Sequence, residues 1–280
     1  MHSTASDGID TPEELLGKII SMGIKTFALA DHDTIKGDFV MLKDRRIKEA
    51  GIKFFPAIEF SCQGNQVKSH VLGYGCDLSN KQFLETINEV SQLRILKHMA
   101  RLERLKNEFR IEFPKESIEH FNTIDSVGKP HIAEEMLRLG FTKSMEEGMK
   151  MLSDKNSKSI RVYTKDAIDA IHAAGGIAVW AHPLGGEGAV HYLRDELLEK
   201  LKIQMEFGID GLECYYSRYS IEEMKMLVEI AKERGLLISG GSDYHGPIKT
   251  ISPGELCADD LEVKEENLTL IAELEKRRNA

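Results

Sequence analysis

The chain contains 280 residues, of which 41% are hydrophobic and 30% are charged, and its formal net charge is -9. This apolar content suffices for one large globular core with a smaller inserted unit, and it excludes a disordered tail. The acidic balance argues against a broad basic surface of the kind that binds duplex nucleic acid through many phosphates.

The cysteines and the opening residues indicate the compartment in which the chain works. Cys62, Cys76, Cys214 and Cys257 form no CxxC pair and lack the density of a secreted disulfide scaffold, which favours a reducing compartment. The first ten residues show no basic region followed by an apolar stretch, and nowhere do eighteen apolar residues follow one another. We therefore expect a cytoplasmic protein with no membrane partner.

Helical segments alternate with short buried strands along most of the chain. The first helix begins after Thr11, with Pro12 in its first turn, and ends at Gly23. The expected helices cover residues 12–22, 37–50, 165–174, 221–234 and 262–280. The expected strands cover residues 25–30, 52–58, 71–74, 177–180, 209–212 and 236–239. This alternation predicts a parallel α/β sheet curled into a barrel.

The segment from 80 to 165 interrupts this alternation. It is long, strongly charged and helical in period, with Leu93, Leu96 and Met99 on a partly buried face. We interpret it as an inserted helical subdomain, with the barrel domain formed by residues 1–79 and 166–280. A lid over the strand ends is the favoured placement, and a bundle packed on the side of the barrel is the alternative.

Imidazoles and carboxylates gather at the ends of the expected strands and in the opening loop. The set is His2, Asp7, His32, Glu59, His70, His182, Asp243 and His245. Mixed nitrogen and oxygen ligands favour Mn, Fe, Zn or Co over Ca or Mg alone, and the lack of cysteine argues against a structural zinc site. Because the set exceeds what one ion needs, two or three divalent ions bridged by a carboxylate are expected.

Each of these motifs has an ordinary structural interpretation when it is taken alone. A single histidine at a strand end is more often a hydrogen-bonded residue than a metal ligand. Asp31-His32-Asp33 followed by Thr34 is compatible with a capped turn, and residues 3–8 are compatible with a polar loop. It is the joint arrangement on successive strand ends that favours the metal site.

Several short motifs together resemble the PHP family, the polymerase and histidinol phosphatase superfamily. They are His2-Ser3 with Ser6-Asp7-Gly8, Asp31-His32-Asp33-Thr34, Glu59, His70, Ala181-His182-Pro183 and Gly241-Ser242-Asp243-Tyr244-His245-Gly246. The likeness covers nearly the whole chain. Within the family, the chain is most similar to stand-alone phosphoesterases that act on nucleoside 3′,5′-bisphosphates or on the 5′ end of short RNA.

The resemblance implies a distorted seven-stranded TIM-like barrel with a trinuclear metal centre. In that arrangement His2, Glu59 and Asp243 would hold the first ion, and Glu59, as a bridge, would hold the second with His70 and His182. Asp7, His32 and His245 would hold the third. The family also has an Arg-Pro-His motif that holds substrate phosphate, and here it reads Lys129-Pro130-His131. Lysine keeps the charge and loses the bidentate fork of arginine.

The opening of the chain departs from the family pattern. The family's first motif is His-x-His after a short strand, whereas Met1 stands here at the position of x. We expect either a start assigned at an internal methionine or a protein that lacks one ligand and one barrel strand. The truncated start is favoured, because loss of the strand would leave a sheet edge open.

The expected function is metal-dependent hydrolysis of a phosphate ester, in which metal-bound hydroxide attacks phosphorus. Asp243 would act as a catalytic ligand, and Asp7 or His245 would move the proton to the leaving oxygen. Lys129, His131 and Arg161 are the candidates for binding a phosphate that is not cleaved. The expected substrate is a small phosphorylated nucleotide or a short RNA end, and manganese is the favoured metal, with iron, zinc and magnesium as alternatives.

Two other functions fit the same residues. One is hydrolysis of histidinol phosphate or another small phosphomonoester. The other is a metal-binding module with impaired catalysis, which the missing first histidine suggests. Substrate comparison separates the first from nucleotide hydrolysis, and full catalytic activity would eliminate the second.

Overall fold

The computed structural model describes residues 1–280 except 125, 154–159, 187, 248, 258–260, 262 and 280. Within the described residues, seven strands form one curled, mixed sheet. They are β1 (Thr26–Leu29), β2 (Lys53–Gly64), β3 (Val67–Tyr74), β4 (Val162–Tyr163), β5 (Ile177–Trp180), β6 (Gly211–Tyr216) and β7 (Leu237–Gly241). The order is β1-β2-β3-β5-β6-β7, and β4 pairs with the end of β2.

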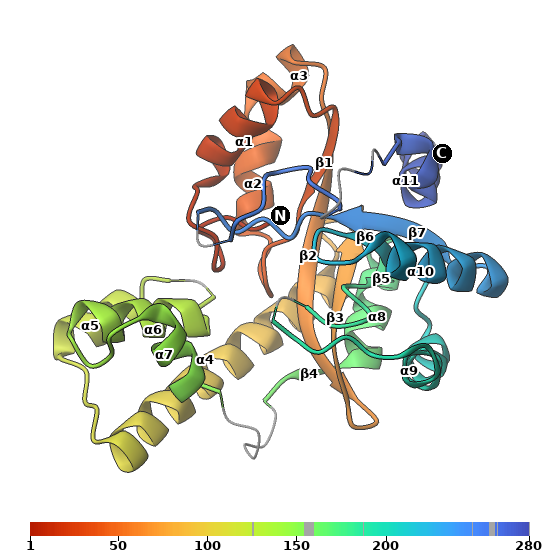
Figure 1. Ribbon diagram of the computed structural model, residues 1–280. Helices are drawn as coiled ribbons and strands as arrows, with labels where there is room; N and C mark the ends of the chain where they lie inside the picture. The colour runs from red at the N-terminus through yellow and green to blue at the C-terminus, as the bar shows by residue number, and fades with distance from the viewer. Residues whose placement is uncertain are drawn as a thin grey trace.

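Helices surround this sheet, and a second group of helices forms the insertion (Figure 1). The helices around the sheet are α1 (Pro12–Ser21), α2 (Lys36–Lys43), α3 (Arg45–Glu49), α8 (Thr164–Ala173), α9 (Arg194–Phe207), α10 (Ile221–Arg234) and α11 (Thr269–Arg278), with a short 3-10 turn at Glu265–Asn267. The insertion contains α4 (Lys81–Phe109), α5 (Lys115–Phe121), α6 (Lys129–Arg138) and α7 (Met145–Met151). None of the helices in the described part of the chain combines the length and the apolarity needed to cross a membrane.

The strand directions correct the expected all-parallel sheet. β3 runs antiparallel to both of its neighbours, β2 and β5, whereas β1 with β2, β5 with β6 and β6 with β7 pair in parallel. The reversal arises because β2 and β3 form a hairpin joined only by Asn65 and Gln66. Both residues have positive φ, as a two-residue type I′ turn requires. A short apolar run does not reveal strand direction, so this reversal was missed.

Several element boundaries also differ from expectation, and three of the differences affect the site. The helix expected over 37–50 is two helices, because Asp44 leaves the helical conformation and its Oδ1 accepts a hydrogen bond from Arg46 N at 2.9 Å, capping α3. β2 continues beyond Glu59 to Gly64, so Glu59 lies inside a strand rather than at its end. His70 likewise lies inside β3. Both side chains are therefore held by paired backbone on a single hairpin.

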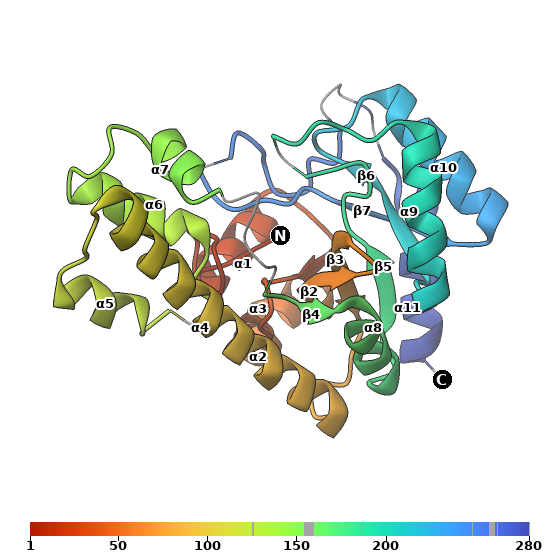
Figure 2. The same ribbon diagram turned by 90° about the horizontal axis from the view of Figure 1, so that it is seen from below.

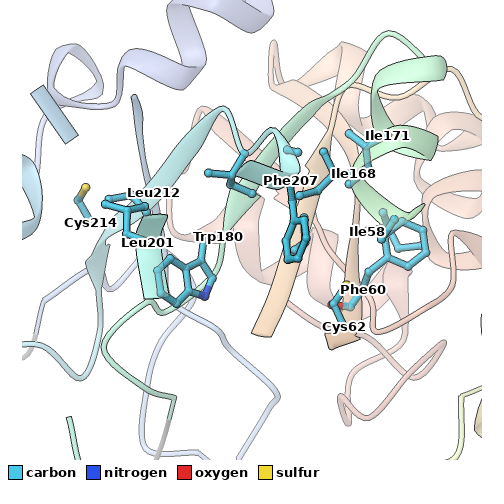
Figure 3. Close-up of a cluster of buried hydrophobic side chains, with 14 of the residues drawn as sticks. Ile58, Phe60, Cys62, Ile168, Ile171, Trp180, Leu201, Phe207, Leu212 and Cys214 are labelled. Carbon is cyan, nitrogen blue, oxygen red and sulfur yellow. The ribbon is translucent and has the colours of Figure 1, made fainter. Parts of the chain in front are cut away.

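The main core lies between the sheet and the helices α8, α9 and α10. Apolar side chains of β2, β5 and β6 pack against α8 and α9, and several are completely buried. Figure 3 shows part of this cluster, with Ile58, Phe60, Cys62, Ile168, Ile171, Trp180, Leu201, Phe207, Leu212 and Cys214 labelled. This packing holds the strands in place. Several of the predicted metal ligands lie on these strands or on the loops that follow them.

The insertion has its own smaller hydrophobic cluster. Its buried members are Leu105, Ile111, Phe121, Ile132, Ala133, Met136 and Leu152. α4 leads away from the sheet and the other insertion helices pack near its far end (Figures 1 and 2). The chain then returns through β4, a two-residue strand that the helical period did not predict.

The sheet is not closed between β1 and β7, which lie at the two ends of its strand order. The backbone of the first residues lies between them, since Ala30 N donates to Met1 O at 2.9 Å and His2 N donates to Tyr244 O at 2.8 Å. A cavity of about 300 Å³ on this side is lined by apolar residues such as Phe27, Leu72 and Leu274, and it extends to His2 and Glu59. The architecture is thus a curled, partly open barrel.

Candidate metal centre

The opening loop places His2 and Asp7 beside the loops that follow β1 and β7. Ser6 N and Gly8 N both donate to Ser3 O at 3.0 Å, which folds the loop tightly. At Gly8 a Cβ atom would lie 2.4 Å from the His2 carbonyl oxygen, so this close approach requires glycine. Local backbone packing therefore explains why Gly8 follows Asp7 in the motif.

Glu59 stands at the centre of the polar set and is buried. Its Oε2 lies 3.1 Å from His2 Nε2, and its Oε1 lies 2.6 Å from His70 Nδ1 and 3.3 Å from His182 Nε2. The ring of His32 is farther, with Nδ1 at 3.9 Å from Glu59 Oε1. One carboxylate thus faces four imidazoles, which is the geometry of a bridging group.

All eight side chains expected to bind metal lie in this one region. Three groups have possible ligand atoms within 4.8 Å of one another: His2, Asp7, His32 and His245; His32, Glu59 and His70; and His2, Glu59 and Asp243. The last group matches the set expected for the first ion, and His182 joins Glu59 and His70 through the contacts given above. His245 Nε2 lies 3.3 Å from Asp7 Oδ1. Their role as ligands remains a prediction.

Unsatisfied polar atoms indicate what these residues can hold. His2 Nδ1 and His32 Nδ1 are buried and have no hydrogen-bond partner in the described part of the molecule, where Asp7 Oδ1 has only the ion-pair contacts with His2 and His245. Burying such atoms without a partner is costly, and a divalent cation would satisfy them. The donor set is nitrogen and oxygen throughout, so the residues fit divalent metal ions.

The pKa values divide the predicted metal ligands into protonated and unprotonated side chains. Burial lowers the pKa of His2, but hydrogen bonds to Asp243 and Glu59 outweigh it and raise the pKa to about 9. Burial lowers the pKa of His32 to about 3. Burial alone would raise the pKa of Glu59, but the surrounding imidazoles hold it well below its usual range. The cluster is therefore rich in carboxylate charge at neutral pH.

The backbone is strained at two of these positions. His182 has φ of 30° and Asp243 has φ of 49°, in the left-handed region that non-glycine residues rarely adopt. Asp33, next to His32, has φ of 58°. Such strain persists where the surrounding structure holds a side chain in a required direction, which is common at functional sites.

Asp31 belongs to a motif named above but was given no role of its own by the sequence. It is fully buried, and its carboxylate accepts hydrogen bonds from Ser3 N at 2.7 Å, Ser3 Oγ at 2.7 Å and Ser6 Oγ at 2.6 Å. It therefore holds the opening loop that carries His2 and Asp7. Ser3 and Ser6 lie 28 and 25 positions from Asp31 in the sequence, so the sequence alone does not reveal these contacts.

We expect Asp31→Asn to loosen this loop. The Asn side chain has only one acceptor oxygen, so it cannot accept hydrogen bonds at both of the positions that the carboxylate oxygens occupy. The free energy of unfolding should therefore fall by about 2–4 kcal/mol, and metal affinity should fall with it. Urea denaturation and metal titration measure the two effects. Asp166→Asn, the same change at an exposed position, is the matched control. Wild-type stability of Asp31→Asn would show that the serine contacts are unimportant.

Two further neighbours of Asp243 were also missed. Tyr216 Oη donates to Asp243 Oδ2 at 3.0 Å, and Lys249 Nζ lies 2.8 Å from the same oxygen. Glu213 Oε2 accepts a hydrogen bond from His182 N at 2.8 Å, and burial raises the pKa of Glu213 to about 7. Glu213 thus orients the backbone of His182.

The three residues expected to bind substrate phosphate lie on the insertion side of the centre. At Gly128, directly before Lys129, a Cβ atom would be 3.4 Å from Asp7 Oδ2. His131 Nδ1 accepts a hydrogen bond from Gly128 N at 2.9 Å, and Ser126 Oγ donates to His32 O at 2.7 Å. Arg161 is mostly buried rather than a solvated surface charge, and its Nη1 has no partner among the described residues.

An α/β sheet with a cluster of imidazoles and carboxylates at one end fits the class of metal-dependent enzymes. No family model matches the chain. It is 29% identical over 267 residues to a 5′-3′ exoribonuclease of Haemophilus influenzae, covering 91% of each chain. It is 24% identical over 253 residues to a 3′,5′-nucleoside bisphosphate phosphatase of Chromobacterium violaceum, covering 88% of this chain and 86% of the relative.

The fold has a similar counterpart among solved structures. A Bifidobacterium adolescentis protein assigned as a metal-dependent phosphoesterase superposes with a TM-score of 0.81 at 25% identity, covering 99% of this chain and 94% of its own. The chain is a homologue of phosphoesterases, and the resemblance to the PHP family is confirmed.

Proposed function

We propose that this protein hydrolyses a phosphate ester of a nucleotide, either a nucleoside 3′,5′-bisphosphate or the 5′ end of a short RNA. The observation that carries the proposal is the buried carboxylate of Glu59 facing His2, His70 and His182 within 3.3 Å. The relatives named as an exoribonuclease and as a bisphosphate phosphatase support this substrate class. Both names describe phosphate esters of nucleotides.

The eight predicted ligands would hold two or three divalent ions, with Glu59 shared between two of them. Manganese is favoured because the donors are imidazoles and carboxylates. Ions bound there would neutralise phosphate charge and bring the pKa of bound water toward neutrality.

The chain's own groups then have separate tasks. His245 and Asp7, whose Nε2 and Oδ1 atoms lie 3.3 Å apart, would hold and move the proton that the leaving oxygen needs. Asp243 would position its ion, supported by Tyr216. Lys129, His131 and Arg161 would orient a phosphate, and residues 80–165 would act as a lid that brings the first two to the centre.

The test is hydrolysis by the chelated and re-metallated protein, measured as inorganic phosphate from a bisphosphate and as nucleoside 5′-monophosphate from an RNA. Adenosine 3′,5′-bisphosphate, a short 5′-phosphorylated RNA and histidinol phosphate are each offered with Mn²⁺, Zn²⁺ or Mg²⁺, with a blunt RNA duplex as control. We expect metal-dependent hydrolysis of the bisphosphate, the short RNA or both, and little hydrolysis of the duplex. Release from histidinol phosphate alone would replace the nucleotide assignment, and no release from any ester would contradict the proposal.

A further inference from the structure

One face of α4 carries a row of positive charges. Arg94, Lys97 and Arg101 are spaced three and four residues apart, so they lie on the same side of the helix. All three are half-buried, although α4 is largely exposed. Nothing in the sequence distinguishes these three residues from the other charged residues of the helix.

Only the first of these cations has an acidic partner. Arg94 Nε lies 2.5 Å from Asp33 Oδ2. Neither Lys97 nor Arg101 has a hydrogen bond or ion pair in the described part of the chain. Arg161, which lies before β4, also has a buried guanidinium nitrogen, Nη1, without a partner among these residues.

These unpaired cations lie close enough to affect one another. Burial, followed by the charges of Arg161, Arg101 and Arg94, lowers the pKa of Lys97 to about 6. Burial, followed by the charges of Arg94, Arg161 and Arg104, lowers the pKa of Arg101 to about 10. Gathering buried like charges without a counterion is unfavourable, and an anion bound among them would reverse that effect.

The cluster lies beside the metal centre and contains none of its predicted ligands. Arg161 precedes Val162, which pairs with Cys62 on β2, the strand that carries Glu59. Arg94 is joined to Asp33, the residue after His32. A phosphate held by this cluster is therefore near the ester that is hydrolysed and distinct from it.

We propose that Lys97 and Arg101, together with Arg161, bind a second phosphate group of the substrate. The proposal rests on the proposed function and narrows it, because the preferred substrate must then carry at least two phosphates. The planar guanidinium groups suit phosphate oxygens in pairs, and the lysine adds a point charge. This extends the phosphate-binding role from residues 129, 131 and 161 to the face of α4.

The test compares a substrate with two phosphates and a substrate with one. Lys97→Gln and Arg101→Gln should each lower kcat/KM for adenosine 3′,5′-bisphosphate by about 10-fold to 100-fold. The loss on p-nitrophenyl phosphate should be at least about tenfold smaller. Arg101→Lys keeps the charge and should recover part of the loss. Lys81→Gln removes a charge from the exposed start of the same helix and should change neither rate.

Calorimetry on the metal-free protein makes the result independent of catalysis. Wild type should bind adenosine 3′,5′-bisphosphate about tenfold or more tighter than adenosine 5′-monophosphate, and Lys97→Gln should remove that difference. This holds even if no ester is hydrolysed, so failure of the proposed function is separately visible. Equal binding of both nucleotides by wild type, or equal losses on both substrates in the variants, would overturn the proposal.

A 5′-phosphorylated diribonucleotide identifies the source of the second phosphate. If the Lys97 variant weakens binding of this ligand and of the bisphosphate alike, the cluster accepts a terminal phosphate or a backbone phosphodiester. If only the diribonucleotide is affected, the cluster binds the RNA backbone. If neither is affected, the cluster does not bind phosphate.

Discussion

Replacing Glu59 with glutamine should reduce phosphate release by about a thousandfold or more. The amide keeps the volume and loses the charge that faces His2, His70 and His182. Because Glu59 is shared between two predicted ions, both should bind more weakly. The increase in melting temperature that Mn²⁺ gives wild type should therefore disappear.

Glu89→Gln is the matched control, since it makes the same chemical change on an exposed part of α4. It should leave phosphate release and metal stabilisation as in wild type. Phosphate release within about tenfold of wild type by Glu59→Gln would show that the site does not depend on this carboxylate.

The metal-free protein should be most stable near pH 6.5. The folded pKa of His2 is about 9, above the ordinary value of 6.5, so its stabilising effect is complete below pH 6.5 and is lost as the pH rises through 9. The folded pKa of His32 is about 3, below 6.5, so the unfolded chain takes up its proton first, and stability falls as the pH drops from 6.5 toward 3. Urea denaturation of the chelated protein at a series of pH values measures this curve.

Metal binding should compete with the protonation of His2. An ion needs the unprotonated imidazole, so it must displace a proton at any pH below about 9. Affinity for Mn²⁺ should therefore rise by roughly tenfold for each pH unit between 6.5 and 8.5. Calorimetry in two buffers of different ionisation enthalpy should detect the released proton. An affinity independent of pH would contradict protonation of His2 in the folded protein.

The positions of the metal-ligand candidates could be predicted because parallel strands bring their following loops to one edge. His32, His182, Asp243 and His245 follow strands in that way. Glu59 and His70 lie beside these residues for a different reason. They lie inside an antiparallel hairpin whose two-residue turn, Asn65-Gln66, lacks the usual glycine.

The residues that were missed act through partners far away in the sequence. Asp31 needs Ser3 and Ser6 to show its role, and Arg94 needs Asp33. Lys97 and Arg101 look like ordinary solvated charges until the return of the chain places Arg161 beside them. β4 was missed because two residues carry no periodicity, and its pairing with β2 depends on a tertiary contact.

The hairpin of β2 and β3 also has a consequence for the order of folding. Glu59 and His70 are separated by 11 positions, whereas Glu59 and His182 are separated by 123. Hairpins form within about 1–10 μs, while contacts between distant segments form later because closing a long loop costs more entropy. Glu59 and His70 can therefore come together early in folding, before the other side chains of the centre. The rate at which the complete centre forms should then be limited by the pairing of β5 with β3 and of β7 with β6.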